Sequence, residues 1–169
     1  MLQIDIRHGT AEDAVLIADL IRDMVVEMAL YGGHTVNTSL KIWSSVAEIV
    51  KVNSARPEYI YLIASQRSPV QTIIGLAAAN IEPLDSIFAV NTRLHFSAIY
   101  TVPSARRQGV AQEMIHKALE WGQYMNAVEA DLNVLVANPA RRLYEQLGFQ
   151  PHEISMVMGL SSDQIAGQR

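Results

Sequence analysis

The fold of this chain is decided by one segment, which reads Tyr100-Thr101-Val102-Pro103-Ser104-Ala105-Arg106-Arg107-Gln108-Gly109-Val110-Ala111. The segment joins an expected strand, which Pro103 ends, to an expected helix. The first turn of a helix carries backbone N–H groups without partners and the positive end of the helix dipole, so it attracts anions. Gly109 lets the backbone approach a ligand closely, and Arg106 and Arg107 add positive charge beside it. The segment therefore predicts an anion site that suits a pyrophosphate.

The same residues also fit an ordinary basic helix start with two solvated arginines. Two well-known phosphate-binding loops are excluded. Gly109 is not followed by Lys-Ser or Lys-Thr, as it would be in a Walker loop. The three spaced glycines of the dinucleotide-binding fingerprint are missing as well. Taken alone, the segment leaves both the anion site and the solvated helix start open.

Outward from this segment, the chain alternates between two periodicities. Apolar residues three and four apart indicate helices, whereas alternation or β-branched runs indicate strands. These patterns predict, in chain order, a strand at 4–6, a helix from Thr10 to Gly32-Gly33, a helix over 39–52, strands over 59–64, 70–81 and 95–101, a helix over 109–124, a strand over 129–136, a helix over 139–147 and a last strand from Phe149 to about Met158. The order β-α-α-β-β-β-α-β-α-β predicts an α+β fold, in which helices flank a mixed, mostly antiparallel central sheet.

Length and composition limit the class of protein. The chain has 169 residues, of which 50% are hydrophobic, and we expect one domain over residues 1–160 with a flexible polar tail over 161–169. The absence of cysteine excludes disulfides, thiolate metal sites and a cysteine nucleophile. We see no signal peptide and no apolar run long enough to cross a membrane, so we expect a cytoplasmic protein without a membrane partner. The net charge of −4 argues against nucleic acid as a partner.

A second segment downstream changes the interpretation. It reads Val136-Ala137-Asn138-Pro139-Ala140-Arg141-Arg142-Leu143-Tyr144-Glu145-Gln146-Leu147-Gly148-Phe149. Together the two segments resemble the GNAT acetyltransferase superfamily, whose first motif is Gln/Arg-x-x-Gly-x-Gly/Ala and whose second has an Asn, an Ala and then Tyr-Glu-x-x-Gly-Phe. The residues that match these motifs are Arg106, Gly109, Ala111 (in place of the commoner glycine), Asn138, Ala140 and Tyr144 to Phe149. The opening Ile6-Arg7-x-x-Thr10-x-x-Asp13 also resembles the family's first strand and helix start, so the resemblance covers nearly the whole chain.

The resemblance implies acetyl-CoA as the cosubstrate and implies no metal. Backbone amides of the first motif would hold the pyrophosphate, and the end of the central strand would pair with the pantetheine arm. The cofactor-binding residues expected in this way are Ile99, Tyr100, Thr101, Arg106, Arg107, Gln108, Gly109, Val110, Ala111, Gln112 and Asn138. The family separates the central strand from the strand that carries residues 134–136, and the thioester enters the gap. Asn138 has a second interpretation, because an Asn before Pro139 can cap the following helix.

The resemblance also implies catalytic groups. Tyr144 occupies the position of the family's general acid, since a phenol with a pKa of about 10 stays protonated at neutral pH and can donate to the departing sulfur. Its alternative is a core aromatic on an amphipathic helix. His95 is the candidate general base, because relatives often carry Glu or His there and only a neutral amine attacks the thioester. Its alternative is a histidine at a fraying strand end. Ser97 could hold a water in the same site.

The acceptor side carries a weaker signal. By resemblance it is built from Glu27 to Asn37, which includes Tyr31 and His34, and from Glu82 and Asp85, although all of these also fit ordinary surface or packing roles. We expect acetyl transfer to a primary amine of a small molecule or peptide through a ternary complex. Four alternatives stay open: another acyl donor, an alcohol acceptor, a non-catalytic acyl-CoA sensor, and a nucleotide or phosphate binder. A homodimer is expected from analogy with relatives alone.

Overall fold

The computed structural model describes residues 3–34, 36–67, 71–84 and 92–157. The regular elements are β1 (Ile4–His8), α1 (Ala14–Met28), α2 (Leu40–Asn53), β2 (Tyr59–Gln66), β3 (Thr72–Pro83), β4 (Thr92–Thr101), α3 (Val110–Tyr124), β5 (Glu129–Leu132) and α4 (Arg141–Gln146). Three short 3-10 turns accompany them, namely η1 (Ala11–Asp13), η2 (Ala29–Tyr31) and η3 (Pro103–Ala105). The expected tail over 161–169 and the acceptor candidate Asp85 lie outside the described residues.

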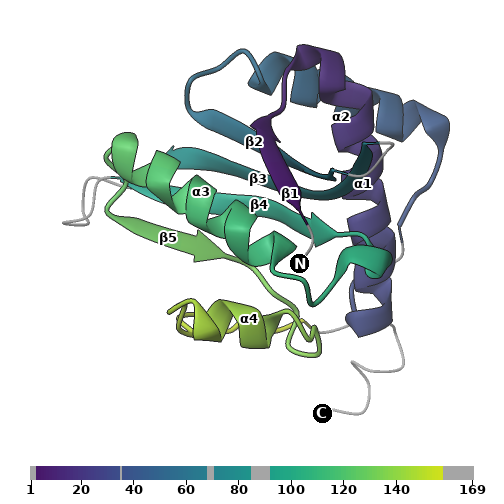
Figure 1. Cartoon of the computed structure of the whole chain (residues 1–169). Coiled ribbons are helices and arrows are strands. Elements are labelled where there is room, and N and C mark those ends of the chain that lie inside the picture. Colours follow the sequence, from purple (N-terminus) through teal and green to yellow (C-terminus); the bar gives the residue numbers. More distant parts are fainter. Residues whose placement is uncertain (1–2, 35, 68–70, 85–91, 158–169) are drawn as a thin grey trace, which may run out of the picture.

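The strands form one sheet in the order β1-β2-β3-β4-β5. Neighbouring strands are antiparallel except β4 and β5, which run parallel. Figure 1 shows α1 and α2 over one face of the sheet, α3 over the other, and α4 beside β5. The predicted α+β fold, with a mixed and mostly antiparallel sheet between helices, is confirmed.

Two hydrophobic clusters hold the helices to the sheet. One packs α3 against the strands and includes Val110, Met114, Ile115 and Ala118. The other packs α1 against the opposite face and includes Ala14, Ile17 and Leu20. At Gly75 on β3, an added Cβ would lie 3.0 Å from the carbonyl oxygen of Tyr100 and 2.9 Å from Met114 Cε. The first turns of α3 therefore sit tightly over the end of β4, where the anion site is predicted.

The start of α1 follows the pattern predicted from Thr10 and Asp13. The Asp13 carboxylate accepts the Thr10 backbone N–H at 2.9 Å and both Arg7 amino groups at 2.7 Å. The hydrogen bond from Arg7 is the main cause that holds the pKa of Asp13 well below its usual range. This cap fixes the angle at which the chain leaves β1 and enters the helix layer.

β4 changes phase at Ser97. In the pairing with β3, Ala78 lies opposite Ala98 and Ala79 lies opposite Phe96, so Ser97 is an extra residue, a β-bulge. Before the bulge, Phe96 packs on the α3 face, and after it the odd-numbered Ile99 packs on that same face. Ala98 belongs to the α1 face. Even-numbered residues of β4 therefore face α3 before the bulge, and odd-numbered residues face α3 after it.

β5 is shorter than predicted. It ends at Leu132 instead of residue 136, and its last pair with β4 is Phe96 and Leu132. Residues 133–135 are irregular, and the apolar Val134 packs against the α3-face cluster instead of extending the strand. The consequence is that β4 continues to Thr101 with no strand of the described residues beside it on the β5 side.

The predicted last strand is wrong for its described part. Residues 149–157 are irregular, and Ile154, Met156 and Val157 have exposed fractions of 89%, 90% and 82%. Pro151 has no N–H to donate, and the short β5 offers little edge to pair with. The alternation of apolar side chains in this segment is therefore present without a strand. Met158 lies outside the described residues.

Candidate functional site

The turn between β4 and α3 has an unusual backbone. After η3, Arg107 has a φ of 61° and Gly109 a φ of 85°. The left-handed region costs a residue with a Cβ about 1–2 kcal/mol, which glycine avoids. Such a conformation in a residue other than glycine is often found where a backbone is shaped for a ligand. Here it turns the chain so that successive amides lead into the first turn of α3.

These amides are free within the described part of the chain. The N–H groups of residues 107–112 form no hydrogen bond with any backbone acceptor there. The first backbone bond of the helix runs from the N–H of Glu113 to the Gly109 carbonyl at 3.0 Å. The cap residue Gly109 has no side chain to accept them. The predicted residues Arg107 to Gln112 therefore form a concentrated set of donors with positive helix-end potential, which is the chemistry an anion requires.

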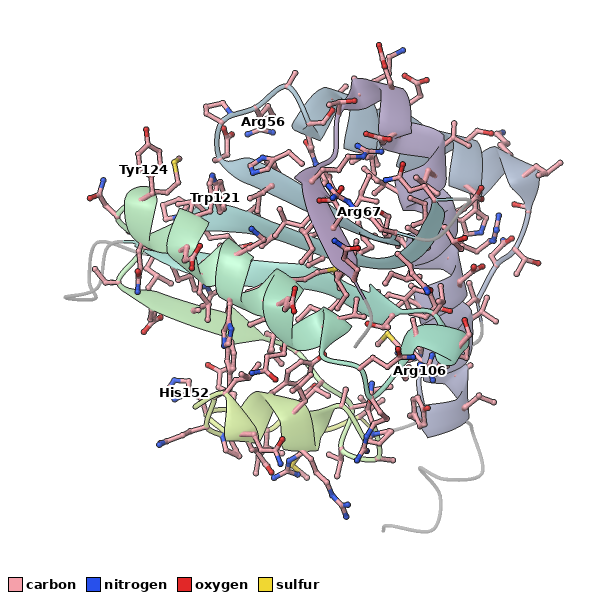
Figure 2. All side chains as sticks on the ribbon, viewed as in Figure 1. Arg56, Arg67, Arg106, Trp121, Tyr124 and His152 are labelled. Carbon is pink, nitrogen blue, oxygen red and sulfur yellow. The ribbon has the colours of Figure 1, made fainter. Side chains whose placement is uncertain are left out.

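Arg106 is held by protein groups. Its Nη2 lies 2.5 Å from Oε2 of Glu27 on α1, and its Nε donates to the Thr101 carbonyl at 3.0 Å. Tyr31 donates to the other oxygen of Glu27 at 3.2 Å. The hydrogen bond to Glu27 raises the pKa of Arg106. Figure 2 shows Arg106 beside the end of α1, so the side chain ties the loop to that helix.

The pairing of Glu27 with Arg106 could not be read from the sequence, because the two residues are 79 positions apart. The acceptor candidates Tyr31 and Glu27 thus lie together in one network with a cofactor-loop residue. His34 forms no side-chain hydrogen bond or ion pair with other described residues. Glu82, the other described acceptor candidate, is paired with Arg93 at 3.0 Å.

The outer half of β4 borders an opening in the sheet. From Ser97 to Thr101 its β5-side edge has no strand partner among the described residues. The hydroxyl of Thr101 is enclosed and, within the described chain, is the one enclosed side-chain polar atom without a hydrogen-bond partner. A buried hydroxyl without a partner costs free energy. The predicted Ile99, Tyr100 and Thr101 therefore present main-chain and side-chain groups that a ligand in the opening could satisfy.

Tyr144 lies on the α3 side of this opening. The residue is 8% exposed, and its ring packs edge-to-face on Phe149, which in turn packs on Phe96 of β4, both at 6.2 Å between ring centroids. Burial raises the pKa of the Tyr144 phenol to about 12. Its hydroxyl has no hydrogen-bond partner among the described residues, and it is not an enclosed atom. The tyrosine is thus a core aromatic, and its hydroxyl has no partner in the described chain.

His95 lies on the opposite face of the sheet. Its Nδ1 is 2.8 Å from Oδ1 of Asp131 on β5, and its side chain is 20% exposed. Arg93 contacts the other oxygen of Asp131 at 3.2 Å and also Glu82 at 3.0 Å. Burial alone would raise the pKa of Glu82, but the hydrogen bonds from Arg93 and Asn80 outweigh it and lower that pKa. The fraying strand end is excluded, because His95 lies inside β4 in an ordered polar network.

Sequence reasoning did not single out Asp131. The available signal was the expected parallel pairing of the two strands, which places acidic residues of the second strand beside the first. Ser97, suggested as a water-holding residue, donates instead to the Ala78 carbonyl at 3.3 Å. The structure thus brings His95 together with Asp131 and Arg93.

Asn138 bonds to the turn before α4, whose N-cap residue is Ala140 and has no side-chain cap. Its Oδ1 accepts the N–H of Ala140 at 2.9 Å, at the turn that leads into α4. It also lines a hollow of about 500 Å³ with Val136, Ala137, Pro139, Arg141, Arg142 and Glu145. The hollow lies where the chain passes from the opening to α4, so Asn138 borders open space.

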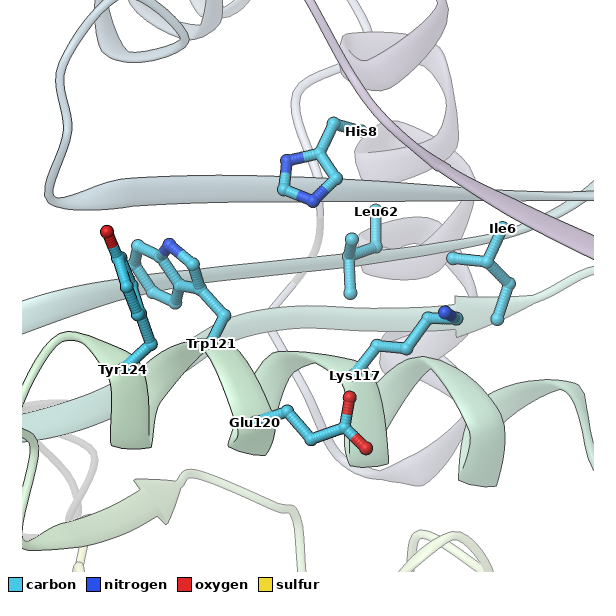
Figure 3. A pocket seen from close by; sticks show the side chains of 7 residues that line it. All are labelled: Ile6, His8, Leu62, Lys117, Glu120, Trp121 and Tyr124. Carbon is cyan, nitrogen blue, oxygen red and sulfur yellow. The ribbon is translucent and has the colours of Figure 1, made fainter.

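A second hollow of about 310 Å³ contains none of the predicted site residues. Figure 3 shows its lining, which is Ile6, His8, Leu62, Lys117, Glu120, Trp121 and Tyr124. It borders the C-terminal half of α3, away from the free amides. Among the described residues, no group of three or more His, Asp or Glu side chains is arranged to bind a metal. None of the helices in this part of the chain is long and apolar enough to span a bilayer.

Comparison with known proteins gives the family. The sequence model of the acetyltransferase (GNAT) family matches residues 35–149. No curated protein matches the chain in sequence. Among solved structures, the chain is similar to a predicted acetyltransferase from Clostridium acetobutylicum with acetyl-CoA, at 18% identity over 94% of this chain and 97% of that one, with a TM-score of 0.75.

Two further structures share the fold. A putative acetyl transferase from Pyrococcus furiosus is 22% identical over 94% of this chain and 100% of that chain, with a TM-score of 0.71. AAC(6')-Iy in complex with the bisubstrate analog CoA-S-monomethyl-acetylneamine is 18% identical over 94% and 99% of the two chains, with a TM-score of 0.68. Identities this low show the fold alone, whereas the family model spans more than half of the sequence. The chain therefore belongs to the GNAT family of acetyltransferases.

Proposed function

We propose that this chain is an acetyl-CoA-dependent N-acetyltransferase, with residues 1–160 as one catalytic domain. It transfers the acetyl group directly to a primary amine of a small molecule or peptide within a ternary complex. The observation that carries the proposal is the run of free amides from Arg107 to Gln112 beside an opening in the sheet. Membership of the acetyltransferase family and the neighbour with acetyl-CoA support the same cosubstrate.

The residues present fit acetyl-CoA. The free amides of residues 107–112 match a pyrophosphate, and the unpaired edge of β4 together with the Thr101 hydroxyl matches the amide groups of a pantetheine arm. Asn138 borders the hollow between the opening and α4. Acetyl-CoA supplies the acetyl group as a thioester, an acyl donor with a good leaving group.

Tyr144 is proposed to donate a hydrogen bond to the departing sulfur. A pKa of about 12 keeps the phenol protonated over the whole working pH range. A thiol has a pKa of about 8.5, so complete proton transfer from this phenol to a thiolate is uphill by roughly 5 kcal/mol. Tyr144 therefore stabilises the charge that develops on sulfur, and any proton that it gives up is quickly replaced from solvent.

His95 is proposed as the base on the opposite face. An alkylammonium must lose a proton before its nitrogen can attack, and His95 Nε2 accepts that proton. The amine nitrogen then forms the C–N bond while the C–S bond breaks and its electron pair leaves on sulfur. The nitrogen loses a second proton and the sulfur gains one, so the sum is ammonium plus thioester giving amide, thiol and one proton.

An amine-panel assay that reads free CoA thiol tests the proposal. The wild type should acetylate at least one amine, and Tyr144→Phe should lower kcat roughly 100-fold, since a positioned proton donor contributes about 10²–10⁴. Tyr124→Phe is the matched control, because Tyr124 is 82% exposed on α3. Tight acetyl-CoA binding without turnover on any amine would favour a sensor instead. Calorimetry that shows ATP bound in preference to CoA would contradict the proposal.

A further inference from the structure

The pairing of β4 with β5 places Asp131 beside His95. The two residues are direct neighbours in the parallel register, and the next pair, Phe96 with Leu132, is the last before the sheet opens. Leu132 packs on the α3 face, so Asp131 and His95 share the face toward α1. The hydrogen bond between them, Nδ1 to Oδ1 at 2.8 Å, therefore sits one pair away from the apex of the opening.

This hydrogen bond selects one tautomer of the imidazole. An ionised carboxylate only accepts hydrogen bonds, so Nδ1 of His95 must carry the proton that it shares with Asp131. The lone pair of the neutral ring is then on Nε2, the nitrogen away from Asp131. Nε2 has no hydrogen-bond partner in the described chain and is not enclosed, so it is open to solvent.

Arg93 fixes the carboxylate without competing for the same oxygen. Its Nη1 lies 3.2 Å from Oδ2 of Asp131, which leaves Oδ1 to the histidine. Arg93 is held in turn by Glu82 from β3 at 3.0 Å. Glu129 acts on Arg93 by charge alone. The charged groups around His95 are thus Glu82, Arg93, Asp131 and, further away, Glu129, and Asp131 is the acid in contact with the ring.

We propose that Asp131 is a positioning residue that holds His95 in the Nδ1–H tautomer, with Nε2 free to accept the proton of the acceptor ammonium at the apex of the opening. This inference rests on the proposed function, because it assigns the orientation of that reaction's base. A carboxylate that orients a histidine also stabilises the imidazolium formed when the ring takes up a proton. Asp131 therefore acts through His95 and touches neither substrate.

The first test determines the tautomer of His95 and does not depend on enzyme activity. Long-range ¹H–¹⁵N correlation spectra of the ¹⁵N-labelled protein distinguish Nδ1–H from Nε2–H rings, and His95→Gln identifies the His95 signals among those of the five histidines. The neutral ring of His95 should be Nδ1–H in the wild type. It should become mixed or Nε2–H in Asp131→Asn, because the amide can also donate to Nδ1. An Nε2–H ring in the wild type would overturn the proposal.

The second test reads the rate. Asp131→Asn should lower kcat roughly 10- to 100-fold, because a general base accelerates a reaction by about 10²–10⁴ and the variant loses only part of that acceleration. KM for acetyl-CoA should change less than about twofold. Asp131→Glu should restore part of kcat. Glu129→Gln is the matched control, because it removes the same charge from the same face of β5 without a contact to His95, and its kcat should stay unchanged.

The two hypotheses fail differently. If the wild type acetylates amines and folded Asp131→Asn keeps its kcat, the positioning role is wrong and the proposed function stands. If the wild type acetylates no amine, the proposed function fails, and the positioning of a base for that reaction fails with it. If Asp131→Asn does not fold, the tautomer of His95 in the wild type and the kcat of Asp131→Glu still test the positioning role of Asp131.

Discussion

The guanidinium of Arg106 lies 2.5 Å from the carboxylate of Glu27, and this contact ties the loop before α3 to the end of α1. Arg106 also donates to the carbonyl of Thr101, so its side chain spans the turn. A motif arginine at an anion site suggests direct contact with phosphate. The observed partners point to a different role, in which Arg106 braces the loop whose amides do the binding.

Paired variants separate these roles. If Arg106 braces the loop, Glu27→Gln should weaken acetyl-CoA binding about as much as Arg106→Gln, and the double variant should add little more. Since both side chains are partly exposed, we expect a coupling of roughly 1 kcal/mol, or about fivefold in Kd. Calorimetric titration of the wild type, the two single variants and the double variant gives the coupling. Unchanged or tighter binding by Glu27→Gln would favour direct contact between Arg106 and the anion.

Gly109 should be needed for its backbone conformation. At a φ of 85° an added Cβ has open space, so the effect of Gly109→Ala is backbone strain of about 1–2 kcal/mol. Relief of that strain would rotate the amides out of their arrangement, and Kd for acetyl-CoA should rise roughly tenfold. Gly148→Ala is the control. Gly148 has a similar φ of 97° and the same open space around an added Cβ, but it lies after α4 and outside the loop before α3. Both should lose similar stability in urea, and only Gly109→Ala should lose binding.

Thr101→Val should separate stability from affinity. Removal of an enclosed hydroxyl that has no partner should stabilise the free protein by about 1 kcal/mol. If that hydroxyl bonds to bound acetyl-CoA, the same change should weaken binding by roughly 2- to 10-fold. Thermal unfolding without ligand and calorimetry with it measure the two effects, and Thr101→Ser, which keeps the hydroxyl, should leave affinity near that of the wild type. A drop in both melting temperature and affinity would mean that the hydroxyl already has a partner in the free protein.

The pKa of Tyr144 predicts an alkaline limit to stability. The folded pKa of about 12 is above the ordinary value of 10.0, so this tyrosine's contribution is complete below pH 10 and is lost as the pH rises toward 12. Over that window the loss amounts to roughly 3 kcal/mol. Urea unfolding at pH 8 and pH 11 should show a smaller decline for Tyr144→Phe than for the wild type. Equal declines would mean that the phenol is solvated in the folded state.

Local patterns in the sequence predicted most of the fold. The helices and the first four strands follow from periodicity, and the turn before α3 follows from Pro103 and Gly109, because these signals depend on neighbouring residues. The ends of β5 and the missing last strand could not be predicted in this way. Apolar side chains at 134–136 and 154–157 look alike in a sequence, and whether they extend a strand depends on whether a second backbone lies beside them.

The same distinction between neighbouring and distant residues applies to the candidate site. The free amides of residues 107–112 were predicted because they depend on a helix start. The pairing of Asp131 with His95 and that of Glu27 with Arg106 were not predicted, because each joins residues on different strands or in different layers. The structure shows the core-aromatic interpretation of Tyr144, and its role as a general acid stays a prediction.

The extra residue at Ser97 has a consequence for how this strand can change during evolution or engineering. Because Ser97 is the extra residue, its deletion would make Phe96 and Ala98 ordinary neighbours on opposite faces and would keep the pairing of Ala98 to Thr101 with β3. If Ser97 were instead paired as a regular strand residue, Ile99 would leave the α3 layer and Tyr100 would enter it. An alignment with a relative that lacks the bulge therefore needs a gap at position 97, since without the gap it would compare residues from opposite faces of the sheet.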